Sequence, residues 1–230
     1  MLQQRLPCAC RFSMWRCLVL GLGLLLVSGT ACAADPASLV NPFVGTAADG
    51  NIVSGAIAPF GMVVLSPDMP NGFYRYGNHH ISGFSMTHLS GCGAPNYGDV
   101  FFTATTGPVR VKPKQYGFGF THKREAASPG YYRVFMKTWG INAQITASTR
   151  CGMARFTFPA GKQGNILIPI SHAANPTIGS NIHIINDHTV TGSVTSTTIT
   201  GLMVAAEGEF LSVNEFLAFL RDTHIGVGST

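Results

Sequence analysis

The residues that could act on a small polar ligand gather in residues 70–99, a loop-like stretch rich in Gly, Asn, His, Ser and aromatic residues. The rings of Phe73 and Tyr74 could stack on the apolar face of a hexose, because aromatic side chains bury a large area at low entropy cost. Packing within the core is the alternative for both rings. His88 could face a sugar or brace the loop, and Asp99 could line a pocket or cap a turn. These four are the predicted substrate-binding residues.

No other pattern in the sequence announces a reaction. The chain has no GxSxG nucleophile elbow, no CxxC motif and no zinc-ligand spacing. The neighbours His79 and His80 would point to opposite faces of an extended chain. Glu125 lies close to His122, which predicts a structural hydrogen bond. The sequence therefore assigns no catalytic residue and no metal ligand.

The N-terminus has the features of a secretory signal. Residues 1–16 carry three arginines and no acid, residues 17–28 form an apolar run, and Ala31-Cys32-Ala33 offers a cleavage site. The run is short for a bilayer span, which needs about 20 apolar residues. An uncleaved anchor is one alternative. A lipid attached at Cys32 is another, although Gly29 stands where a lipobox has Leu. We therefore expect a periplasmic or secreted protein with no stable membrane span after removal of residues 1–33.

Charge and cysteine content limit the classes of partner. Only 11% of the 230 residues are charged, against about 25% in ordinary globular domains. This excludes a disordered charged tail, a coiled coil and a nucleic-acid-binding arm. Without residues 1–33, twelve basic and ten acidic residues remain, so we expect no nucleic-acid partner. Cys92 and Cys151 also remain, either as a disulfide or as two buried thiols.

The elements that must position these residues read as strands. Apolar and polar residues alternate in residues 131–138, 141–149 and 153–158, and Ser128-Pro129-Gly130 is a strong turn signal. A hairpin is expected to turn at Asn186-Asp187. This pattern predicts an all-β sandwich. A capping box at residues 212–215 predicts one short C-terminal helix near 212–221.

Several segments occur together in a recognisable order. They are VNPFVGT (40–46), APFGMV to SPD (58–68), ISGFSMTHLSG (81–91), YGD (97–99), PGYY (129–132), AQITASTRCGMARFTFP (143–159) and ILIPISHA (166–173). This set resembles the N-terminal domain of glycoside hydrolase family 92, the secreted calcium-dependent exo-α-mannosidases. Two positions depart from the family's pattern. Met86 stands where His is frequent, and Gln144 stands where Glu is common.

The resemblance implies a fold and a division of labour. The N-terminal part is a β-sandwich of the galactose-mutarotase-like type (a supersandwich), and a larger (α/α)6 barrel follows it. The family inverts the anomeric carbon, with an acid and a base about 6.5–9.5 Å apart. In the family both groups lie on the helical domain, with much of the calcium shell. We therefore expect calcium ligands outside this chain and mannose-containing glycans as partners.

The resemblance fades near Ser196, which sets the expected domains. They are a signal peptide (1–33), a β-sandwich (34–198) and a divergent tail (199–230). A disrupted reading frame would explain such a tail. We expect the sandwich alone to be inactive. The alternatives are a non-catalytic carbohydrate-binding or interaction module, and a poorly folding remnant that self-associates through its exposed domain interface. The sequence does not fix the glycan linkage or the oligomeric state.

Overall fold

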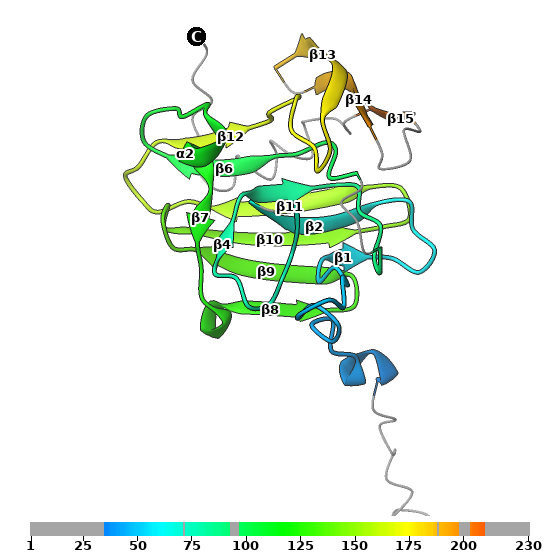
Figure 1. Cartoon of the computed structure of the whole chain (residues 1–230). Coiled ribbons are helices and arrows are strands. Elements are labelled where there is room, and N and C mark those ends of the chain that lie inside the picture. Colours follow the sequence, from blue (N-terminus) through cyan, green and yellow to red (C-terminus); the bar gives the residue numbers. More distant parts are fainter. Residues whose placement is uncertain (1–34, 71, 93–96, 188, 198–202, 210–230) are drawn as a thin grey trace, which may run out of the picture. The chain divides into compact units, whose positions relative to one another are not determined.

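The structure is a computed structural model that describes residues 35–70, 72–92, 97–187, 189–197 and 203–209, with the backbone alone in the last range (Figure 1). The expected signal peptide and the helix near 212–221 lie outside these residues. The chain divides into two compact units, residues 1–36 and 37–230. No helix within the described ranges has the length and apolar character needed to cross a membrane.

The described residues are mostly strands, as predicted. In chain order the elements are η1 (Pro36–Leu39), β1 (Ala56–Ile57), β2 (Val64–Met69), β3 (Gly72–Phe73), β4 (His80–Ile81), β5 (Gly83–Ser85), β6 (Thr103–Thr106), α2 (Pro113–Tyr116), β7 (Phe118–Gly119), η2 (His122–Arg124), β8 (Glu125–Ser128), β9 (Tyr131–Met136), β10 (Ile141–Ala147), β11 (Gly152–Thr157), β12 (Gly164–Leu167), β13 (Thr177–Asn186), β14 (Thr189–Thr197) and β15 (Met203–Glu209).

An antiparallel sheet in the order β11-β10-β9-β8 forms one layer (Figure 1). The alternation read from the sequence holds here, because Tyr132, Val134 and Met136 of β9 are buried while the residues between them are more exposed. The hairpin between β8 and β9 turns at Pro129-Gly130, since Ser128 pairs with Tyr131. Gly130 has φ +73°, which suits position i+2 of a β-turn that has Pro129 at position i+1.

A second sheet joins β1, β2 and β3, with β5 paired to β2. Leu65 of β2 and Phe84 of β5 are fully buried in the same apolar cluster as the inward residues of β9, β10 and β11. Burying each such side chain contributes roughly 1.5–3 kcal/mol. The apolar core therefore lies between these two sheets, as expected of a sandwich.

The opposite face of the second sheet is polar and also buried. Ser66 pairs with Ser85, and Asp68 pairs with Gly83. Because side chains alternate along a strand, Ser66 and Asp68 point away from the face that carries Leu65. The side chains of Ser66, Asp68 and Ser85 are all buried. This buried polar face is where the candidate site forms.

Three smaller sheets complete the described chain: β12 with β6, β4 with β7, and β13-β14-β15. The hairpin of β13 and β14 turns where it was expected, since Asn186 pairs with Thr189. β15 lies inside residues 199–230, expected as a divergent tail, and it pairs along β14. The domain boundaries drawn from the sequence stay predictions. Cys92 and Cys151 are not joined by a disulfide.

Candidate functional site

His88 is the centre of the buried polar face. Its side chain is fully shielded from solvent. Nδ1 lies 2.7 Å from the Val64 carbonyl oxygen, and Nε2 lies 2.8 Å from Oδ1 of Asp68. The hydroxyl of Ser85 is 3.2 Å from Nε2. Strand β2 thus supplies two of the three partners and β5 the third, so the ring ties the loop that follows β5 back onto β2.

The electrostatics of this group favour a charged ring. Burial lowers the pKa of His88, but the charge and hydrogen bond of Asp68, with smaller contributions from the Val64 carbonyl and Asp99, outweigh it and raise that pKa above 6.5. Burial raises the pKa of Asp99, against a nearby Ser196 hydroxyl that favours the ionised form. Neither carboxylate oxygen of Asp99 has a hydrogen-bond partner of good geometry among the described residues.

The structure brings three of the four predicted site residues together. Phe73 lies opposite Asp68 in the β2–β3 pairing. Its ring meets the His88 ring edge-on, with centroids 5.6 Å apart and an angle of 62°. Asp99 interacts electrostatically with both His88 and Asp68. His88 and Asp99 are buried, so in this conformation they brace the loop, while Phe73 is half-buried at its edge. Their assignment as substrate-binding residues stays a prediction.

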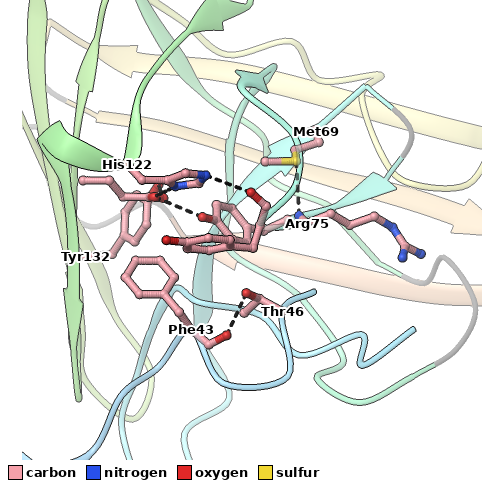
Figure 2. A network of polar contacts seen from close by, with 9 residues as sticks. Phe43, Thr46, Met69, Arg75, His122 and Tyr132 are labelled. Carbon is pink, nitrogen blue, oxygen red and sulfur yellow. Dashed lines mark hydrogen bonds and ion pairs between the residues drawn. The ribbon is translucent and has the colours of Figure 1, made fainter. Parts of the chain in front are cut away.

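Tyr74, the fourth predicted residue, belongs to a different cluster. Its hydroxyl donates to Glu125 Oε2 over 3.0 Å, and the hydroxyl of Tyr132 donates to Oε1 over 2.6 Å. Nδ1 of His122 lies 2.6 Å from Oε2, which confirms the predicted bond between His122 and Glu125. Figure 2 labels His122 and Tyr132 in this network, and the Phe43 ring packs against the Tyr74 ring with centroids 6.1 Å apart.

The Glu125 cluster is structural in character. The Glu125 side chain is only 1% exposed, and three donors occupy its two oxygens. Burial, followed by the negative charge of Glu125, raises the pKa of Tyr74 and of Tyr132 far above the ordinary range. Nε2 of His122 faces the carbonyl oxygen of Tyr76, and the two rings stack with centroids 4.0 Å apart. A carboxylate so fully engaged has no lone pair exposed to a ligand.

Asp68 is the functional residue that the sequence did not single out. It stands in Ser66-Pro67-Asp68, which reads as the turn closing an apolar burst. In the structure these three residues are the second half of strand β2. The available signal was the spacing, because Ser66 and Asp68 are two apart and so share a face.

No metal centre is found in the described ranges, where no three or more His, Cys, Asp or Glu side chains are arranged to hold an ion. The carboxylates of Asp68 and Glu125 contact imidazole rings instead. His79 lies near His122, with centroids 5.1 Å apart. Within the part of the chain that the structure describes, the side chains therefore do not fit a calcium site.

A small hollow lies elsewhere on the second unit. It is lined mainly by apolar residues: Val100, Phe101, Ile168, Pro169, Ile170, Asn181, Ile182, Gly192, Ser193 and Val194. None of the four predicted site residues lines it. Such a lining offers few hydrogen bonds to a sugar.

Comparison with known proteins agrees with this architecture. Residues 39–210 match the sequence model of the glycosyl hydrolase family 92 N-terminal domain. A GH92 α-mannosidase from Bacteroides thetaiotaomicron, solved in complex with mannoimidazole, is 39% identical with a TM-score of 0.66, over 69% of this chain and 23% of that one. The GH92 glycosyl hydrolase ccman5 is 30% identical with a TM-score of 0.65, over 74% of this chain and 25% of that one.

A third solved structure, the GH92 inverting mannosidase of Bacteroides thetaiotaomicron VPI-5482, is 25% identical with a TM-score of 0.56. It matches over 67% of this chain and 21% of its own. No curated protein matches the chain. The chain thus spans about a quarter of the length of the solved relatives it resembles.

Proposed function

The chain belongs to glycoside hydrolase family 92, as its N-terminal domain, and from this premise we propose that it forms one wall of the glycan site of an α-mannosidase-type hydrolase. The observation that carries the proposal is the state of its carboxylates. Among the side chains that the structure describes, Asp68 and Glu125 contact histidines and Asp99 is fully buried. The other described acids, Asp35, Asp49 and Asp187, are exposed.

An inverting glycosidase needs two carboxyl groups on opposite sides of the scissile bond, about 6.5–9.5 Å apart, with water beside one of them. The side chains of Asp68, Asp99 and Glu125 are shielded from solvent, so in this conformation none of them presents an oxygen to a substrate and that water. We therefore place the acid and the base outside the described residues, in the part of the relatives that this chain does not match. We propose mannose as the sugar because one of these solved relatives is an α-mannosidase and another is an inverting mannosidase.

The proposed wall consists of Phe73 and the start of the loop after β5. The Phe73 and His88 rings contact each other in a T-shaped arrangement, and Phe73 is half-buried. Leu89, next along the loop, is 48% exposed. A half-buried aromatic ring keeps part of its surface available for a hexose, because aromatic side chains offer a large apolar area. His88 and Asp99 support this wall from beneath.

Calcium and export complete the proposal. The family's calcium dependence leads us to propose that its ligands also come from the part of the relatives that this chain does not match, since the described residues do not fit such a site. No step of the reaction is assigned to the ion here. Residues 1–33 would direct the chain to the periplasm or the exterior, because they have the charge, length and cleavage pattern of a secretory signal.

Two measurements test the proposed function. Incubation of the purified chain with α-1,2-mannobiose in calcium buffer should give no mannose, and turnover by the chain would overturn our placement of the acid and base. Titration with the same sugar by NMR should shift signals of Phe73 and Leu89, and Phe73→Ala should abolish those shifts. Phe135→Ala serves as the control, because Phe135 lies on β9 beneath Arg124. Equal loss in both variants would contradict the wall.

A further inference from the structure

We propose that His88 is a buried, protonation-dependent clamp that holds both ends of the loop after β5, residues 87–92 and 97–99, together with the Phe73 ring, onto strand β2. The clamp does not require the chain to bind a glycan. It therefore stands or falls separately from the function proposed above.

The first step is the hydrogen-bond inventory of the ring. Nδ1 faces a carbonyl oxygen at 2.7 Å and Nε2 faces a carboxylate oxygen at 2.8 Å. A carbonyl and an ionised carboxylate only accept hydrogen bonds, and only the imidazolium form of histidine donates from both nitrogens. A neutral ring keeps a single proton: on Nδ1 it bonds Val64 and leaves Asp68 unpaired, and on Nε2 it bonds Asp68 and leaves Nδ1 facing the carbonyl oxygen without a donor. Loss of one proton therefore breaks one of the two contacts that hold the ring on β2.

The second step is the set of charges around the ring. Asp68 reaches it from β2, and Asp99 faces it from the far end of the loop. His172, from the segment after β12, lies close enough to Asp68 for that charge to act on its pKa, although burial lowers the pKa overall. His172 is thus a neutral neighbour at pH 7, whereas the two carboxylates both favour a proton on His88.

The third step is the conformation that the clamp must hold. Tyr97 and Gly98 have φ values of +62° and +75°, and Val100 has φ +57°. A β-branched residue in this region is strained, and such strain persists only where surrounding contacts determine the backbone. Two backbone hydrogen bonds close the loop, from Met86 to Asp99 and from Gly98 to the Thr87 carbonyl. The His88 ring adds the side-chain contacts that fix the loop to the sheet.

The same clamp reaches the Phe73 ring. Asp68 and Phe73 face each other across β2 and β3, and the Phe73 ring rests edge-on against the His88 ring. Phe73 therefore contacts both members of the His88–Asp68 pair: His88 through its ring and Asp68 as its cross-strand partner. A change in the contact between His88 and Asp68 should move Phe73 as well. The loop and this aromatic ring respond together.

The direct test is an NMR titration of the histidine rings in the unmodified chain. His88 should be protonated on both nitrogens at pH 7, above the ordinary histidine pKa of 6.5, and should lose its proton only at higher pH. Over the same pH range, amide exchange at Gly98 should accelerate relative to β10 amides, after correction for the intrinsic rate. A neutral His88 ring at pH 7 would overturn the proposal without any variant.

A variant then tests the coupling. Asp68→Asn should lower the pH at which His88 titrates and should speed amide exchange at Gly98 by about tenfold or more, since one pKa unit corresponds to a tenfold change in equilibrium. Asp187→Asn is the matched control, because Asp187 is exposed in the turn after β13. An Asp68→Asn protein that folds but changes neither readout disproves the clamp. If that variant does not fold, the titration of the unmodified chain decides.

Discussion

Two adjacent tyrosines on β9 allow one substitution to be compared in two environments. Tyr132 is fully buried, and its hydroxyl donates to the charged carboxylate of Glu125 over 2.6 Å. Tyr131 is half-buried, and its hydroxyl accepts a hydrogen bond from the neutral amide of Gln144 over 2.7 Å. Replacement by Phe removes only the oxygen in each case, so the two variants differ in the charge and burial of the partner that they leave.

The magnitudes follow from those partners. A hydrogen bond to a charged group contributes about 1.5–3 kcal/mol, whereas a neutral one contributes about 0.5–1.5 kcal/mol. Tyr132→Phe should therefore cost about 1.5–3 kcal/mol and Tyr131→Phe about 0.5–1.5 kcal/mol. In a domain of this size 1 kcal/mol corresponds to about 2–4 °C in Tm. The expected losses are about 3–12 °C for Tyr132→Phe and about 1–6 °C for Tyr131→Phe.

Thermal and urea unfolding of the two variants beside the unmodified chain measure this difference. Equal slopes of the urea transitions would show that both variants unfold from comparable states. If Tyr132→Phe proves no more destabilising than Tyr131→Phe, the Glu125 carboxylate is not the buried, charged acceptor described above. That result would refute the reasoning for the whole cluster.

Three further predictions concern other parts of the domain. The pKa of His88 in the folded chain lies above 6.5, so the stability that its proton contributes is complete below pH 6.5 and is lost as the pH rises through the folded pKa. Urea unfolding of the unmodified chain and of His88→Gln measures this contribution. The difference in their free energies of unfolding should narrow above pH 6.5. Gly83→Ala should cost about 1–3 kcal/mol, because a methyl group there would collide with a buried phenyl ring, whereas Gly77→Ala, which meets nothing, should change stability by under about 0.5 kcal/mol. Ile184 is 78% exposed on β13, the edge strand of its sheet, and is our candidate for self-association. Ile184→Lys should reduce the amount of oligomer measured by light scattering more than Val109→Lys, which changes an exposed apolar residue outside that strand. Equal effects of the two variants would contradict a role of the β13 edge.

The sandwich was predictable because its strands obey a simple period. Along β9 every second residue is buried, and a Pro-Gly pair sets the turn before it, so pattern and turn chemistry agree. The same rules fail in residues 70–99, whose composition predicts a loop. That stretch contains β3, β4 and β5, each only two or three residues long. Strands so short show no period, and the pairing of β4 depends on β7, which lies far away in the chain.

The candidate site was predictable by residue type and not by geometry. Phe73, His88 and Asp99 do lie together, but the sequence could not show that Asp68, twenty residues before His88, is the partner that orders them. Tyr74 was grouped with Phe73 as a neighbour. Adjacent residues of an extended chain point to opposite sides, so the Tyr74 side chain points away from Phe73 and its hydroxyl donates to Glu125.

The two clusters solve one physical problem in the same way. Irregular loops lack the ladder of backbone hydrogen bonds that fixes a strand, so something else must hold them on the sheets. Here an imidazole between a carboxylate and a backbone carbonyl does so twice: the buried His88 lies between Asp68 and Val64, and the half-buried His122 lies between Glu125 and Tyr76. Buried ion pairs add little net stability, because desolvation offsets most of the attraction, but removing one partner is costly. Such pairs therefore select one loop conformation over others, and the proposed wall of a sugar site would require such a fixed loop.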